Sequence, residues 1–132
     1  MQGDMDELEA QSAYIKEFPD TFKEAFDKVR NRAGYTLEQL SEKMNLEERQ
    51  LRRWLKDPRL KHINEDFVTI LTLILKLPDW ISDLLYDRAH IRLSGSDPRH
   101  RAIRFIQRVL WMDGVEKANA FLSDKGFEPL TV

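Results

Sequence analysis

Residues 36–57, TLEQLSEKMNLEERQLRRWLKD, decide the fold of this chain. Thr36, followed three residues later by Gln39, is a capping-box pattern that opens a helix. The helical spacing of apolar residues then breaks at Asn45, a residue type that tolerates a positive φ, and resumes over 47–56. Two short helices joined by so few residues cannot pack as an antiparallel hairpin, so they must cross at a steep angle. The pattern therefore predicts a helix-turn-helix.

The second helix of this pair is basic on the side that its apolar residues leave free. Leu51, Trp54 and Leu55 mark its inward face. The outward side chains are Glu48, Arg49, Arg52 and Arg53. An exposed helix with several arginines suits the major groove of DNA, because guanidinium groups bind guanine edges and also reach phosphates. The sequence thus predicts a DNA-contacting helix over 47–56.

The rest of the chain is predicted to be helical, with no strand, so the expected class is all-α. Apolar spacing and capping residues indicate further helices at 21–34, 64–77, 78–88, 98–112 and 113–126. Pro78 is expected in the first turn of its helix, and Asp113 is expected to open the last one. Residues 19–89 then form a five-helix domain and 90–132 a two-helix C-terminal extension. Residues 1–18 are acidic, and both disorder and a turn of helix are open there.

The composition excludes several kinds of site. The 132 residues contain no cysteine, which excludes a disulfide scaffold, a thiolate zinc site and a cysteine nucleophile. The three histidines share no metal-ligand spacing, and neither a Gly-rich phosphate loop nor a serine nucleophile motif is present. The longest mainly apolar stretch, 67–77, is too short to span a bilayer. We expect a cytoplasmic protein that is not an enzyme, without metal, cofactor, small-molecule ligand or membrane partner.

The formal net charge is only −2, but the charges are segregated along the chain. Residues 1–20 hold six acids against one lysine, whereas 49–62 hold six bases against one acid. Residues 88–108 hold six arginines against one aspartate. Three of those arginines fall on one face of the helix at 98–112: Arg101, Arg104 and Arg108. Three roles are open for them: extending a phosphate-binding surface, pairing with the acidic N-terminal segment, or facing solvent.

Residues 36–57 resemble the helix-turn-helix of the lambda-repressor and Cro class of bacterial and phage regulators, and the likeness extends over 22–85. The matching positions are Thr36, Leu40, Ser41, Met44, Leu46, Leu51 and Trp54. The resemblance implies a lambda-repressor-like five-helix DNA-binding domain. Residues 78–130 resemble, more loosely, the helical extension of such regulators on Firmicute mobile elements.

The resemblance also implies a function: a transcriptional regulator that binds double-stranded DNA in a sequence-specific way as a homodimer. The residues carried over to base contact are Glu48, Arg49 and Arg53, with Gln50 and Arg52 at the edge of the helix nearer phosphate. Thr36 and Lys56 complete the expected DNA-binding set. Dimerisation is expected through the helix at 78–88 or through the helical pair at 98–125.

Three departures from that class affect the expected DNA contacts. Asn45 stands at the turn position that is usually glycine, and Leu37 replaces a glutamine that would contact phosphate. The recognition helix opens with Glu47 and Glu48, whose charges stabilise a helix N-terminus but repel phosphate. Glu48 would instead specify sequence if it accepts a hydrogen bond from a cytosine amino group. These acids keep an alternative open, in which the same fold is a protein–protein interaction module that has lost DNA binding.

Overall fold

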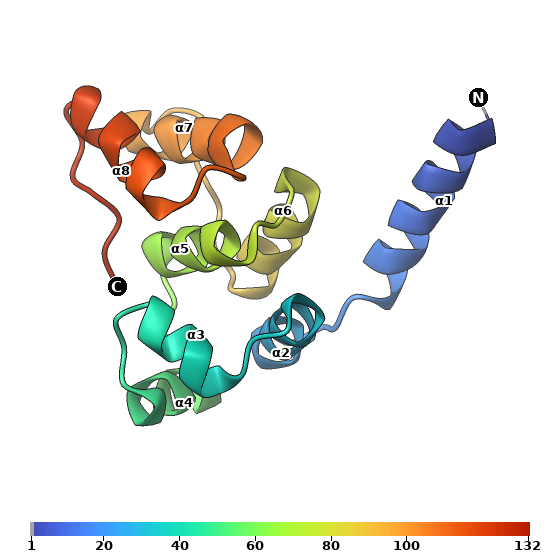
Figure 1. Ribbon diagram of the computed structural model, residues 1–132, viewed down its shortest axis with the longest axis horizontal. Coiled ribbons are helices and arrows are strands. Elements are labelled where there is room, and N and C mark those ends of the chain that lie inside the picture. Colours follow the sequence, from blue (N-terminus) through green and yellow to red (C-terminus); the bar gives the residue numbers. More distant parts are fainter. Residues whose placement is uncertain (1) are drawn as a thin grey trace.

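The computed structural model describes residues 2–132, with side chains described from Met5 onward. These residues form eight α-helices and one π-helical segment, and they contain no strand (Figure 1). In order, the elements are α1 (Gln2–Glu17), α2 (Phe22–Ala33), α3 (Leu37–Lys43), α4 (Glu48–Lys56), α5 (Glu65–Leu75), α6 (Asp79–Arg88), α7 (Pro98–Phe105), η1 (Ile106–Leu110, π-helical) and α8 (Val115–Asp124). The all-α class predicted from the sequence is confirmed.

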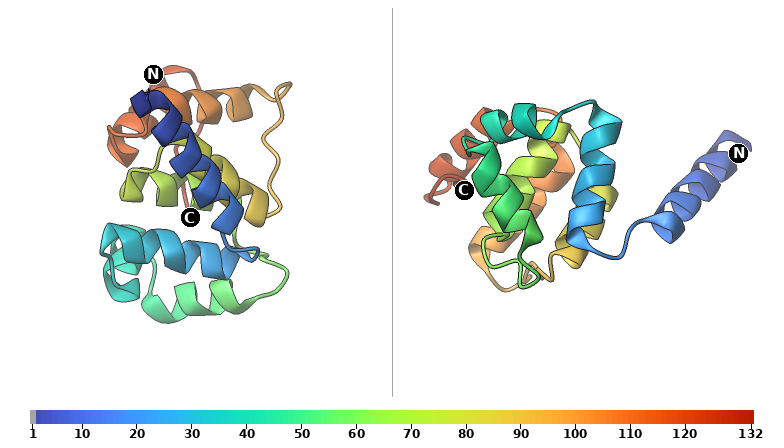
Figure 2. Two further views of the ribbon diagram at one scale, coloured as in Figure 1. Left: turned by 90° about the vertical axis from the view of Figure 1, so that its right-hand side faces the viewer. Right: turned by 90° about the horizontal axis from the view of Figure 1, so that it is seen from below.

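The helices from α2 onward are stacked in three tiers (Figures 1 and 2). Helices α2, α3 and α4 form one outer tier, α5 and α6 the middle one, and α7 and α8 the other outer tier. Helix α5 therefore has neighbours on both sides and packs against α2, α6 and α8. This position explains why its sequence is apolar nearly all round.

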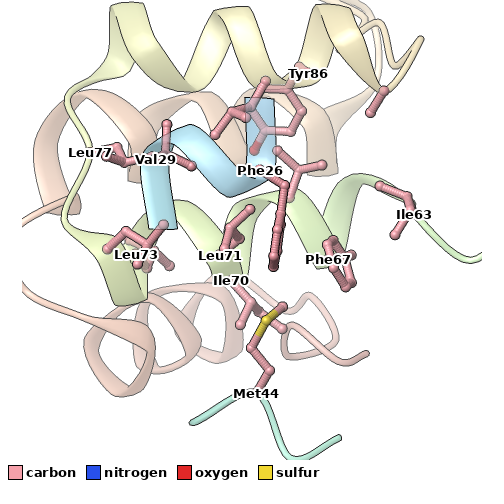
Figure 3. Close-up of a cluster of buried hydrophobic side chains, with 14 of the residues drawn as sticks. Phe26, Val29, Met44, Ile63, Phe67, Ile70, Leu71, Leu73, Leu77 and Tyr86 are labelled. Carbon is pink, nitrogen blue, oxygen red and sulfur yellow. The ribbon is translucent and has the colours of Figure 1, made fainter. Parts of the chain in front are cut away.

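One buried cluster extends through all three tiers. Phe26 of α2, Met44 at the end of α3 and Leu71 of α5 all belong to it and are almost fully buried (Figure 3). Burying a side chain of this size stabilises a fold by roughly 1.5–3 kcal/mol. The position of α3, and of the turn that follows it, is therefore fixed by the core.

Side-chain caps are present at the N-termini of α3, α5 and α7, and the capping box predicted at Thr36 is one of them. The Thr36 hydroxyl oxygen accepts the Gln39 N–H at 3.1 Å, and the Gln39 side-chain oxygen accepts the Thr36 N–H at 2.9 Å. Asn64 caps α5 by accepting the Phe67 N–H at 2.9 Å. Asp97 caps α7 by accepting the N–H groups of the first helical turn. Each cap satisfies backbone donors that a helix N-terminus otherwise leaves unpaired.

Three predicted helix boundaries are wrong. Pro78 has a ψ of 161°, so it caps α6 from outside instead of lying in its first turn. The helix expected over 98–112 is α7 followed by the π-helical η1, a rare wide turn for which sequence patterns carry no signal. Gly114, not Asp113, precedes α8, because its φ of +91° is a conformation that side chains disfavour.

Helix α1 stands apart from the three tiers (Figures 1 and 2). Near its end, the Tyr14 ring lies edge-on to Trp80 with centroids 5.4 Å apart, and the Lys28 ammonium lies 4.6 Å from the Tyr14 centroid. Of the two states left open for residues 1–18, the structure has the helical one, over sixteen residues. Residue 1 lies outside the described part of the chain.

Candidate nucleic-acid interface

A turn at residues 44–47 separates α3 from α4. Asn45 has a φ of +59°, in the left-handed region, so the helix does not continue through it. The Leu46 N–H donates to the carbonyl oxygen of Ser41 at 2.9 Å and closes the turn. As a result, α3 and α4 run in clearly different directions (Figure 2, right). The break at Asn45 that the sequence predicted is confirmed.

The inward face of α4 is anchored in the core. Leu51, Trp54 and Leu55 are buried, as the sequence predicted. The Trp54 ring lies 6.2 Å from Phe67 of α5, and the His62 ring stacks on it at 4.8 Å from the loop beyond α4. Trp54 therefore contacts both α5 and the loop beyond α4, and these contacts anchor the inward face of the helix.

The opposite face of α4 is open to solvent and basic. Its four basic side chains are exposed: Arg49, Arg52, Arg53 and Lys56. The Arg49 side chain is 91% accessible to solvent. Glu48 and Gln50 are half-buried and flank this face on either side. Four bases and one acid give α4 a formal charge of +3, and no large apolar side chain of this helix is exposed.

Two ion pairs lie on this face, and both are weak enough to open. Arg52 Nη2 donates to Glu48 Oε1 at 2.7 Å, and Arg49 Nη2 lies 4.0 Å from Glu47 Oε2. Exposed pairs of this kind contribute only about 0.2–1 kcal/mol. Exchanging these carboxylates for an anionic ligand therefore costs little. The pairs also offset part of the repulsion that Glu47 and Glu48 would exert on that ligand.

The loop after α4 adds two further basic side chains, Arg59 and Lys61, beside the end of that helix. Asp57 accepts the Arg59 N–H at 2.9 Å and the Lys61 N–H at 3.4 Å, which folds the loop back beside the end of α4. These backbone N–H groups, that of Arg59 above all, lower the pKa of Asp57 below its usual value. Arg59 and Lys61 are exposed. Both residues lie within the basic stretch 49–62, but the sequence predicts no role for either of them.

Thr36 lies at the start of α3, away from the turn. Its side-chain oxygen serves as the cap for Gln39, but its hydroxyl hydrogen remains available to donate. The next residue, Leu37, is half-buried and packs against the core. Position 37 thus stabilises the fold and offers no polar group to a ligand.

The arginines of the second basic stretch are largely engaged within the chain. Arg99 donates from both Nη atoms to the two carboxylate oxygens of Asp66, at 2.8 and 3.1 Å, and this pairing raises the pKa of Arg99. Arg104 Nη1 donates to Asp83 at 3.4 Å. Arg101 donates to the Gly95 carbonyl oxygen at 3.1 Å. Pairing with α5 and α6, which was not among the three roles left open from the sequence, accounts for Arg99 and Arg104, whereas Arg108 faces solvent, as one of those roles has it.

The chain matches no family model, no curated protein and no solved structure with which it was compared. Within residues 5–132, no group of three or more His, Asp or Glu side chains is placed to hold a metal ion. No helix in the described part of the chain has both the length and the apolar character needed to cross a membrane. The chemistry that the α4 face offers is the binding of an extended anion by several guanidinium groups.

Proposed function

We propose that this chain is a sequence-specific, double-stranded DNA-binding transcriptional regulator of the lambda-repressor and Cro type, with α4 in the major groove. The observation that carries the proposal is the α4 face itself. Its arginines are exposed on a helix that Trp54 fixes in the core and that Asn45 sets at an angle to α3. A positively charged helix without exposed large apolar groups suits the edges of bases and the phosphates that flank them.

The side chains of α4 divide into two roles. Arg49 and Arg53, one helical turn apart, would read base edges, and guanine is the base that arginine binds best. Arg52 and Lys56, with Thr36 from α3, would bind phosphates and set the position of the helix. Gln50 would contact the DNA from the flank of the helix.

Glu48 has a conditional role in this proposal. In the free protein its carboxylate accepts from Arg52. When Arg52 turns to a phosphate, the Glu48 oxygens are released and can accept from a cytosine amino group. The repulsion expected from Glu48 would then be replaced by a specific contact.

The regulator would act as a homodimer in the cytoplasm. One domain of this size buries a modest interface with DNA, and proteins of this type bind two half-sites ~34 Å apart. A dimer doubles the contacts and makes the operator palindromic.

Selection of binding sites from a random duplex pool tests the proposal. We expect a palindromic site whose recovery is lost with Arg53→Ala and retained with Arg92→Ala, a matched exposed arginine outside α4. Fluorescence anisotropy on the selected duplex then gives the affinity. If the wild-type protein selects no sequence and stays free of any duplex at micromolar concentration and low salt, the DNA proposal is wrong and the interaction-module alternative is favoured.

A further inference from the structure

The exposed large apolar side chains gather on two elements. Seven such side chains are exposed among residues 5–132, and six of them form two groups. The first group, which we name the α1 stripe, is Met5, Leu8 and Ile15. The second, which we name the α7 patch, is Phe105, Val109 and Met112. Exposed apolar groups clustered in this way mark surfaces that another molecule covers.

The α1 stripe lies on a helix that is strongly acidic. Its members are spaced three and seven residues apart, which places them along one side of α1. They are 58%, 60% and 45% exposed. Five acids and one lysine give α1 a formal charge of −4. Because α1 stands away from the tiers, this side of the helix has no cover in a single copy (Figures 1 and 2).

The α7 patch has the opposite charge. Phe105 ends α7, Val109 lies in η1 and Met112 lies in the turn that follows η1, so the three are close along the chain. Arg101, Arg104 and Arg108 alternate with them along the sequence, and residues 98–110 hold four arginines and no acid, a formal charge of +4. A groove of about 360 Å³ runs along the patch, lined among others by Leu93, Arg104, Phe105 and Val109.

The patch is rigid, and its charge is only partly neutralised. Phe105 stacks on Phe121 of α8 with centroids 4.7 Å apart, which holds its ring in place. Arg108 is exposed and makes no ion pair or hydrogen bond within the described chain. The patch thus offers a fixed apolar surface beside an arginine that is free to bind a carboxylate.

We propose that the α1 stripe of one copy binds the α7 patch of a second copy, and that the second copy returns the same contact. The acidic charge of α1 is complementary to Arg101 and Arg108, the patch arginines without a carboxylate partner, and each surface covers the other's exposed apolar groups. A reciprocal contact closes a two-fold dimer and leaves neither surface exposed.

A second copy fits the patch better than the α1 of the same chain. In one copy, Tyr14 packs on Trp80 and directs α1 away from the tiers (Figure 1). The α7 patch lies in the outer tier opposite to α4, so this dimer leaves the basic face of α4 free. The inference rests on the homodimer of the proposed function and names its interface. Its tests use no DNA, so failure of this interface and failure of DNA binding by α4 are distinguishable.

Disulfide trapping tests the contact directly, because the wild-type chain has no cysteine. The double variant Leu8→Cys/Val109→Cys is oxidised mildly and run on a non-reducing gel. We expect a covalent dimer that reduction dissolves, and far less of it from the matched control Leu8→Cys/Glu38→Cys, whose second site is exposed on α3. A disulfide within one chain, or cross-linking no stronger than in the control, would overturn the proposal.

Sedimentation equilibrium of the full chain tests the charges. We expect the wild type to dimerise, and Glu9→Arg or Arg108→Glu to weaken the dimer by about tenfold each, a typical coupling for one close charge pair. Combining Glu9→Arg with Arg108→Glu should restore it, while Lys43→Glu on α3 should leave it unchanged. Circular dichroism checks that each variant stays helical. If the wild-type chain is monomeric at a protein concentration of tens of micromolar, the dimer proposal is wrong. The α7 patch would then be expected to bind an acidic helix of another protein.

Discussion

Helix α4 and the α7–η1 segment carry similar positive charge in different surroundings. On α4 the exposed face is purely charged, whereas on α7–η1 the arginines alternate with Phe105 and Val109. Charge alone attracts a polyanion such as DNA. Charge mixed with exposed apolar groups suits an acidic, amphipathic protein surface, because apolar contact requires a partner that can also lose water. The two surfaces are therefore distinguished by the side chains between the arginines and not by the number of arginines.

The two segments also differ in what lies behind them. Both segments are anchored by buried apolar side chains, but α7–η1 also joins a buried polar network through Gln107. Gln107 Nε2 donates to Thr72 Oγ1 at 2.8 Å and to the Tyr86 hydroxyl oxygen at 3.0 Å. The Tyr86 hydroxyl lies 2.5 Å from Thr69 Oγ1. Burial raises the pKa of Tyr86, so its hydroxyl stays neutral and continues to donate. The C-terminal helices are thus tied into the fold of α5 and α6.

The largest expected difference between α4 and α7–η1 is in operator affinity after the two outward arginines of α4 are removed. The double variant Arg49→Ala/Arg53→Ala should lose roughly 2–6 kcal/mol of affinity for a selected operator, because each bidentate base contact is worth about 1–3 kcal/mol. Its preference over random duplex should disappear. Arg101→Ala/Arg108→Ala is the matched comparison: it should weaken the proposed dimer and lower operator affinity less, and it should keep the preference for the operator over random duplex, since patch arginines are not needed for base contact. Fluorescence anisotropy measures both, and equal losses in the two variants would remove the distinction.

Breaking the polar network should test whether α7–η1 belongs to the fold. Gln107→Ala leaves a cavity and unpaired hydroxyl groups on Thr72 and Tyr86, so we expect it to lower the free energy of unfolding by about 2–4 kcal/mol. Gln50→Ala, at the half-buried flank of α4, should change it by about 0.5 kcal/mol or less. Urea denaturation followed by circular dichroism gives both values. Similar losses of unfolding free energy in the two variants would show that the network around Gln107 does not stabilise the fold.

Replacing one phosphate-binding arginine of α4 should change how the affinity for DNA depends on salt concentration. Arg52→Ala should weaken binding to all duplexes alike and reduce the slope of log affinity against log salt by about 1, as loss of one phosphate contact does. Arg104→Ala should leave the slope unchanged, because Arg104 is paired with Asp83 on another tier. The measurement is anisotropy over a range of potassium chloride concentrations. A slope that responds to Arg104 and not to Arg52 would reverse the assignment.

The smallest effect concerns the loop at the end of α4. Its backbone N–H groups lower the pKa of Asp57 from the usual 3.8. Because the folded-state pKa is depressed, the contribution of this carboxylate to stability is present above the usual pKa and is lost as pH falls through the lowered value. Carbon-detected NMR titration of the Asp57 carboxyl should therefore give a midpoint below 3.8. A midpoint at or above that value would show that the loop does not hold Arg59 and Lys61 beside α4.

Local features of the fold could be predicted from the sequence. The Thr36 and Gln39 cap, the left-handed Asn45 and the buried Trp54 each depend on residues close in sequence, so spacing alone indicates them. The open face of α4 follows from the same spacing, because 3.6 residues per turn separate the inward from the outward side chains. The flanking, half-buried positions of Glu48 and Gln50 are finer than such spacing can resolve.

Features that depend on distant residues could not be predicted. Arg99 pairs with Asp66, 33 residues away, and Gln107 reaches Thr72, 35 residues away. No spacing rule connects such positions, because tertiary packing brings them together. The apolar side chains of the α7 patch have the helical spacing of a buried face, so a periodicity rule assigns them to the core.

Backbone amide NMR during titration with the selected duplex tests most directly the claim that α4, and not α7–η1, is the DNA-binding surface. We predict the largest shift changes over residues 48–56 and in the loop at 57–61, with smaller changes at Thr36 and little change over 98–110. Shift changes concentrated over 98–110, with the amides of α4 unmoved, would contradict the account.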